Sequence, residues 1–154
     1  MSLSWIRAAG AGVIAGVVAT VAQIVLWWAF TDDLPHILYR DARLTAAILM
    51  GPGVLPPPST FDLKIMIVAT IIHFGLSVAY GLILGRAIHR LSMRPALFCG
   101  LVFGLILYVV NMYGITEIFP WFSAVRDWIT IIAHAVFGVS VAAAYKVLPI
   151  NHSA

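Results

Sequence analysis

Apolar residues along this chain gather into four long runs that are separated by shorter polar segments. The runs cover residues 8–30, 64–85, 96–114 and 128–147. A helix needs about 20 apolar residues to cross the hydrocarbon core of a bilayer, and each run is about that long. The pattern therefore predicts an all-α protein, an integral membrane four-helix bundle whose single transmembrane domain takes in residues 1–154.

The connection between the first two runs is long enough to hold a helix of its own, predicted at about residues 35–50. Its charged residues Arg40, Asp41 and Arg43 fall away from an apolar face. That face is formed by Leu34, Ile37, Leu38, Leu44 and Ile48. Such an amphipathic pattern is typical of a helix that lies on a membrane surface, and we expect this one on the periplasmic side.

Composition supports the membrane interpretation. Of the 154 residues, 62% are hydrophobic and only 10% are charged, whereas a soluble domain carries about 25% charged residues. A soluble fold of this composition would have too little polar surface to cover itself. The single cysteine, Cys99, excludes an intrachain disulfide. No basic run suits nucleic acid, so we exclude that class of partner.

The distribution of cations predicts the orientation in the membrane. With the N-terminus inside, the inner cations are Arg7, Arg86, Arg90, Arg94 and Lys146, and the outer ones are Arg40, Arg43, Lys64 and Arg126. Three of the inner cations share one short loop, and short cation-rich loops favour the cytoplasmic side. We expect a multi-pass protein of the bacterial inner membrane with both termini in the cytoplasm.

The first and third runs match each other at a fixed offset, Ala8 against Ala96. The matched pairs are Ala8 and Ala96, Gly12 and Gly100, Gly16 and Gly104, Thr20 and Tyr108, and Gln23 and Asn111. The second and fourth runs align at His73 and His134. The chain is therefore interpreted as two pseudo-repeated helical hairpins, with chance recurrence as the alternative. The Gly-xxx-Gly spacing predicts close packing between helices.

Polar side chains near the middle of the runs are the candidate functional residues. His73 and His134 lie at similar depth, and Gln23 and Asn111 lie roughly one turn further out. Residues three or four apart share a helix face, which places Thr70, Ser77 and Tyr80 beside His73, and Thr130 beside His134. These eight residues predict a polar layer that opens toward the periplasm.

Four interpretations of this layer stay open. In the simplest, each histidine only forms hydrogen bonds that fix helix packing. In the second, the layer binds or conducts a small solute, an ion or protons, since histidine changes charge near neutral pH; the lack of a carboxylate within a run weakens proton coupling. In the third, His73 and His134 are the axial ligands of a non-covalent b-type haem. In the fourth they bind a metal, but two histidines are too few for a closed zinc site, so no metal site is predicted.

Catalysis is not predicted. The sequence contains no His-Glu-x-x-His or Gly-x-Ser-x-Gly motif, and no acid lies within a run to orient Ser77 and His73. Two pairs of charged residues, Asp62 with Lys64 and Arg126 with Asp127, lie at the outer ends of runs. We expect them to form local ion pairs at the interface. The alternative is a charged mouth that the helix at 35–50 covers.

Several segments resemble a group of small four-span bacterial inner-membrane proteins. They are Gly-x-x-x-Gly-Val-Val-Ala-Thr at 12–20, Tyr-Arg-Asp-Ala-Arg-Leu at 39–44, Leu-Pro-Pro-Pro at 55–58 and His-Phe-Gly-Leu-Ser-Val-Ala-Tyr-Gly at 73–81. The resemblance implies localisation and span count but no activity. Three functions remain: a solute-binding or transport protein, a haem electron-transfer protein, and an accessory subunit of a larger complex. A homo-oligomer is also expected.

Overall fold

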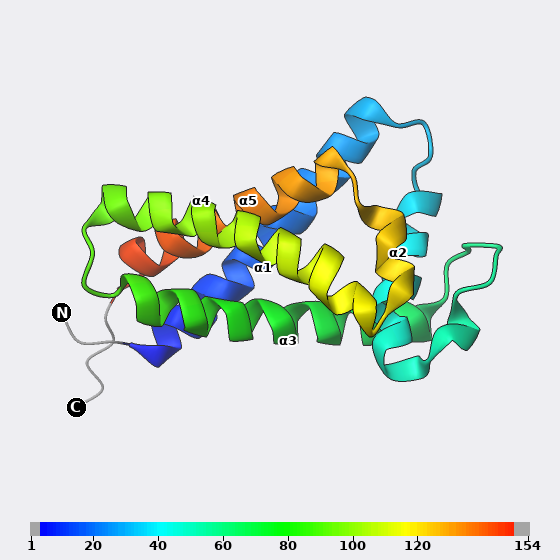
Figure 1. Cartoon of the computed structure of the whole chain (residues 1–154), viewed down its shortest axis with the longest axis horizontal. Coiled ribbons are helices and arrows are strands. Elements are labelled where there is room, and N and C mark those ends of the chain that lie inside the picture. Colours follow the sequence, from blue (N-terminus) through cyan, green and yellow to red (C-terminus); the bar gives the residue numbers. More distant parts are fainter. Residues whose placement is uncertain (1–3, 150–154) are drawn as a thin grey trace.

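The computed structural model describes residues 4–149, and all regular structure in that range is helical (Figure 1). The elements are α1 (Trp5–Phe30), α2 (His36–Met50), η1 (Pro52–Val54), α3 (Leu63–Ile88), α4 (Met93–Val109), η2 (Val110–Gly114), η3 (Ile115–Glu117), η4 (Pro120–Val125) and α5 (Trp128–Val147). This confirms the predicted all-α fold. It also confirms the helix expected at about 35–50.

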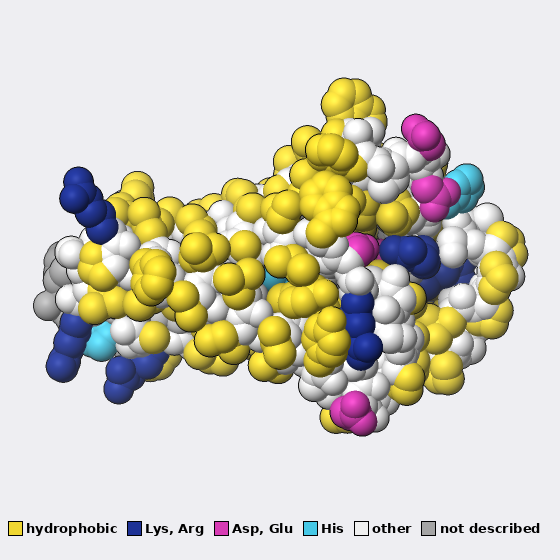
Figure 2. Space-filling view, turned by 45° about the horizontal axis from the view of Figure 1, so that its top comes forward, with side chains coloured by type: hydrophobic (Ala, Val, Ile, Leu, Met, Phe, Trp, Pro, Cys, Tyr) yellow, Lys and Arg dark blue, Asp and Glu magenta, His cyan; other side chains and the backbone are white. Residues whose placement is uncertain are grey.

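Among residues 4–149, four helical segments are long and apolar enough to cross a membrane. They are Trp5–Phe30, Leu63–Ile88, Met93–Glu117 and Trp128–Val147, and each overlaps one of the four predicted runs. Large apolar side chains such as Ile6, Ile71 and Phe98 point outward, and apolar atoms cover most of the elongated face in Figure 2. The chain therefore has the construction of a multi-pass membrane protein.

Polar side chains begin three of these helices. The side chains of Ser4, Asp62 and Asp127 accept hydrogen bonds from the backbone N–H groups three residues later, as N-cap residues do. The ion pairs expected between Asp62 and Lys64 and between Arg126 and Asp127 are wrong. Within residues 4–149 the Asp and Glu side chains pair instead as Asp41 with Arg40, while Asp33 lies 3.7 Å from the His36 ring.

One end of the bundle is closed by cations that bond to helix carbonyls. α1 begins and α5 ends at this end, beside the turn between α3 and α4 (Figure 1). The Lys146 ammonium donates to the carbonyl of Ile88, at 2.8 Å, and to that of Leu91. The buried Arg7 side chain donates to the Tyr145 carbonyl and lies over the Tyr145 ring. These bonds satisfy carbonyls that the helix ends leave open.

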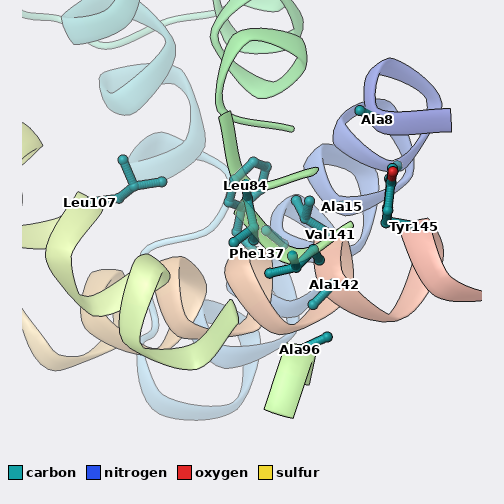
Figure 3. Close-up of a cluster of buried hydrophobic side chains, with 12 residues drawn as sticks. Ala8, Ala15, Leu84, Ala96, Leu107, Phe137, Val141, Ala142 and Tyr145 are labelled. Atoms are coloured by element: carbon teal, nitrogen blue, oxygen red, sulfur yellow. The ribbon is translucent and has the colours of Figure 1, made fainter. Parts of the chain in front are cut away.

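The main core lies between α1, α3, α4 and α5, and small residues form much of it. Ala8, Ala15, Val141, Ala142 and Tyr145 are almost fully buried, and Figure 3 shows them drawn together around α5. Small side chains let helix axes approach closely, which increases dispersion contact where lipid supplies no hydrophobic drive.

Glycines occupy the closest approaches between α1 and α3. A Cβ atom added at Gly12 would clash with the Ser77 carbonyl, and one at Gly81 would lie 2.6 Å from the Ala8 carbonyl oxygen. A Cβ added at Gly16 would lie 2.8 Å from Oγ of Ser77. Most of these neighbouring atoms belong to the backbone, which cannot move aside as a flexible side chain can.

The contact between α4 and α5 has the same form. A Cβ added at Gly100 would clash with the Gly138 carbonyl, and one at Gly138 would clash with the Gly100 carbonyl. A Cβ added at Gly104 would meet the carbonyl of His134. The glycines of both helix pairs therefore lie in the halves of their helices that are nearer the cationic end.

Beyond these contacts the helices spread apart, and α2 fills the opening (Figure 1). Ile37 packs with Trp27 of α1 and Ile129 of α5, while Ala46 packs with Ile65 of α3. Trp121 of η4 donates a 2.9 Å hydrogen bond to the Leu44 carbonyl. The burial of Ile37 and Leu44 agrees with the predicted apolar face. Asp41 lies off that apolar face, as predicted, yet its side chain lines a cavity between the helices.

The packing role of these glycines gives a direct prediction. Gly104→Ala should destabilise the protein by about 1–3 kcal/mol, since overpacking a tight contact costs that much. Gly75→Ala is the matched control, because Gly75 also lies in a membrane helix and nothing lies within 4 Å of its added Cβ. Thermal unfolding in detergent checks both; equal melting temperatures for the two variants would contradict the account.

Candidate functional site

Two adjoining cavities lie where the helices spread apart. The larger has a volume of about 440 Å³ and lies between α1, α2, α3 and α5. The smaller has a volume of about 210 Å³ and reaches between α3 and α4. His73, His134, Thr20, Gln23 and Thr45 line both. The pair of cavities is therefore one polar region with a shared wall.

All eight residues predicted from the sequence line one or both of these cavities. Thr70 and Thr130 line the larger, Ser77, Tyr80 and Asn111 line the smaller, and the remaining three, Gln23, His73 and His134, line both. The structure thus brings together side chains from α1, α3, η2 and α5. Their role in binding stays a prediction.

His134 belongs to a chain of directed hydrogen bonds across the smaller cavity. Its Nδ1 atom lies 2.8 Å from the Thr130 carbonyl oxygen, which only accepts, so Nδ1 carries the proton. Its Nε2 atom then accepts from the amide of Asn111 at 3.3 Å. The Tyr80 hydroxyl donates to Oδ1 of Asn111 at 2.9 Å. The chain joins α3, η2 and α5.

His73 has the opposite arrangement. Its Nε2 atom lies 3.3 Å from the Gly16 carbonyl oxygen and 3.2 Å from Oγ1 of Thr20, so Nε2 carries the proton. Its Nδ1 atom makes no hydrogen bond with any residue in the 4–149 range, and the same holds for the side-chain amide of Gln23. These groups remain available to a ligand.

A π-helical segment places Asn111 at the cavity. η2 interrupts the third membrane helix at Val110–Gly114, and such insertions are frequent at functional sites. The Arg126 guanidinium donates to the Met112 carbonyl at 2.6 Å and to Oγ1 of Thr116 at 2.7 Å. It also lies over the Tyr113 ring. Arg126 therefore holds the irregular backbone rather than pairing with Asp127.

Sequence reasoning missed Asp41 and Thr45 as members of the site. Both lie on α2, four residues apart, and both line the larger cavity. The i,i+4 spacing of a carboxylate and a hydroxyl was the available signal. It was missed because Asp41 was grouped with Arg40 and Arg43 as residues off the apolar face of this helix.

Burial raises the pKa of the Asp41 carboxyl to about 6, although the neighbouring Arg40 guanidinium acts to lower it. Asp127 at the start of α5 adds a smaller repulsion. Side chains of His, Cys, Asp and Glu form no group of three that could hold a metal ion anywhere within residues 4–149. The site is thus a mostly uncharged polar cavity with one carboxylate.

Comparison of the chain with protein-family models, with curated proteins and with solved structures finds no match. The resemblance to small four-span bacterial membrane proteins stays a prediction.

The raised pKa of Asp41 predicts a pH-dependent stability. The folded protein holds the Asp41 proton more tightly than the unfolded chain, whose carboxyl titrates near 3.8. Stability therefore falls as the pH rises between about 4 and 6. Asp41→Asn should stabilise the protein by about 1–3 kcal/mol above pH 6, since one pKa unit corresponds to about 1.4 kcal/mol. This gain should shrink toward pH 4.

Melting temperatures in detergent from pH 4 to pH 8 test this expectation. Asp33→Asn is the control, because the Asp33 side chain is 66% exposed and should show no such gain. A lower melting temperature for Asp41→Asn at pH 8 would mean that the ion pair with Arg40 outweighs the burial of the carboxylate.

Proposed function

We propose that this protein binds a small solute or ion in the cavity region beneath α2, as a binding or transport protein of the membrane. The observation that carries the proposal is the convergence of polar side chains from four helices, α1, α2, α3 and α5, on about 440 Å³ of space. Binding sites are typically concave, largely apolar and supplied with a few convergent polar groups. Apolar residues such as Val17, Leu38 and Met66 complete the lining.

The free hydrogen-bonding groups support binding over a purely structural role for the histidines. If His73 only fixed helix packing, Nε2 would suffice, yet its Nδ1 atom and the Gln23 amide are left for another partner. The bonds of Tyr80, Asn111 and His134 give the other wall a fixed geometry.

The haem alternative receives less support. Axial ligation through Nε2 needs a free lone pair on that atom. Nε2 of His134 already accepts from Asn111, and Nε2 of His73 carries a proton toward Gly16. Both bonds would have to break, with a change of tautomer at His73.

The accessory-subunit alternative also receives little support from the structure. Glycine stripes on the outer surface would favour docking against a larger complex. Gly12, Gly16, Gly81, Gly100 and Gly104 instead face neighbouring helices of the same chain. A homo-oligomer stays a prediction.

We further infer that the two helical hairpins are an internal repeat. The glycine contacts support this, because Gly12 meets Ser77 where Gly100 meets Gly138, and Gly16 meets His73 where Gly104 meets His134. Both comparisons follow the offset that aligns Ala8 with Ala96 and the offset that aligns His73 with His134. Each hairpin would then supply one wall of the cavity region, and the two walls would be versions of the same structural unit.

The charge distribution supports an inner-membrane location with both termini in the cytoplasm. The end that holds Arg7 and Lys146 also receives Arg86, Arg90 and Arg94 at the turn between α3 and α4. Acidic side chains appear only at the opposite end of the face drawn in Figure 2. The cavities would then lie in the periplasmic half of the membrane.

A cavity-filling variant tests the proposed function. Thr45 lines both cavities, so Thr45→Trp should abolish the rise in melting temperature that any bound solute produces. Leu49→Trp is the control, because Leu49 lies on the same helix and is 70% exposed. The measurement is a thermal-shift screen in detergent with neutral, cationic and anionic compounds. The proposal fails if Thr45→Trp keeps every shift seen with the wild-type protein, or if the wild-type protein shows none.

A further inference from the structure

We propose that the ligand of this cavity is an organic cation, an ammonium group on an apolar body, and that Asp41 is the residue that binds its charge. The inference rests on the proposed function and narrows it to a class of compound. The carboxylate comes from α2, outside the four apolar runs, none of which contains one.

The charge of the cavity wall is the first argument. Asp41 is the one Asp, Glu, Lys or Arg side chain among the described residues that line either cavity. The other polar groups are hydroxyls, amides and neutral imidazoles. A cavity with one carboxylate and otherwise neutral walls attracts cations and rejects anions.

The geometry of the Arg40–Asp41 pair is the second argument. Nε and Nη2 of Arg40 lie 2.9 Å and 2.8 Å from the same oxygen, Oδ1 of Asp41. Oδ2 makes no hydrogen bond with any residue from 4 to 149. Arg40 does not itself line the cavity. It acts as a positioning residue that holds the carboxylate from one side, and a ligand ammonium can bind Oδ2 from the other.

The aromatic rings of the larger cavity are the third argument. Trp27, Phe74 and Phe122 line it together with Asp41. Aromatic faces attract cations and also provide apolar contact for the body of the ligand. Among neutral, cationic and anionic solutes, an apolar cation gains from both the carboxylate and the rings.

The mouth of the larger cavity is the fourth argument. Val17, Val21 and Thr70 line the cavity and are also exposed on the outer surface of α1 and α3. These positions lie within membrane-spanning helices, so the cavity opens toward lipid. An amphiphilic cation that partitions into the membrane can enter there, with its apolar body toward the bilayer and its ammonium group toward Asp41.

Two probes of matched shape test the inference. 1-Naphthylmethylammonium carries the charge, and 1-naphthalenemethanol has the same ring system without it. Isothermal titration with the full-length protein in phosphatidylglycerol nanodiscs, corrected with empty nanodiscs, should show tighter binding of the ammonium probe. Asp41→Asn should weaken its binding about tenfold to a hundredfold, as expected for the loss of a charged hydrogen bond. The same substitution should leave the binding of 1-naphthalenemethanol unchanged.

Control variants separate the possible outcomes. Asp33→Asn should bind both probes like the wild-type protein, because Asp33 is exposed and lines neither cavity. If the alcohol binds as tightly as the ammonium probe, and Asp41→Asn changes neither, the inference is overturned while the proposed function stands. If neither probe binds the wild-type protein, the inference is overturned, and the thermal-shift screen decides whether the proposed function falls with it.

The ammonium group could belong to a free amine or to an ethanolamine lipid. Replacing half of the phosphatidylglycerol with phosphatidylethanolamine distinguishes the sources. Weaker binding of the ammonium probe in the mixed nanodiscs supports recognition of the lipid amine. Unchanged binding supports a free amine.

A pH series adds a second readout. The cation binds the ionised carboxylate, so affinity for the ammonium probe should fall as the pH drops below about 6, the pKa of Asp41. The other groups that face this region are Arg40, Asp127, His73 and His134. Protonated histidines would also repel a cation. The part of the pH dependence that Asp41→Asn removes belongs to Asp41, and an identical pH profile in that variant would contradict the inference.

Discussion

The close approach of helix backbones at glycine is the constraint on which this structure depends. Gly12, Gly81, Gly100, Gly104 and Gly138 each face backbone atoms of a neighbouring helix, where no larger side chain fits. Straight helices that touch closely along one half must separate along the other when they cross at an angle. The same contacts that pack the cationic end therefore open the opposite end, and the polar side chains lie in the opening.

The opening is stabilised by α2 rather than by the membrane helices themselves. Ile37, Leu44 and Ala46 pack against separate neighbours, so α2 bridges α1, α3, α5 and η4. This position brings the Asp41 carboxylate into contact with a region that is otherwise uncharged. Burial of a carboxylate is unfavourable for folding, and proteins commonly accept such destabilisation where function needs it. The unfavourable burial is consistent with a role of Asp41 in binding.

Much of the fold could be predicted from the sequence because long apolar runs permit few structures in a membrane. Helical spacing was also enough to predict that the eight polar residues lie together. Residues three or four positions apart share a helix face, so His73 and His134 each identify the polar face of their own helix. Asp41 could not be predicted in the same way. The direction of its side chain depends on how α2 packs between segments that are distant in the chain. The local sequence pattern is equally consistent with a helix on the membrane surface. The π-helical turn at Asn111 likewise depends on Arg126, fifteen residues away in the chain.

Cysteine labelling along the inner face of α1 tests the central claim most directly. In a Cys99→Ala background, single cysteines at Ala8, Ala15, Thr20 and Gln23 would be treated with a small methanethiosulfonate reagent. The account predicts no labelling at Ala8 and Ala15, which are fully buried in the glycine-packed half. It predicts labelling at Thr20 and Gln23, which line the cavities. Uniform protection along the face, or labelling at Ala8 and Ala15, would contradict the division of the bundle into a closed half and an open half.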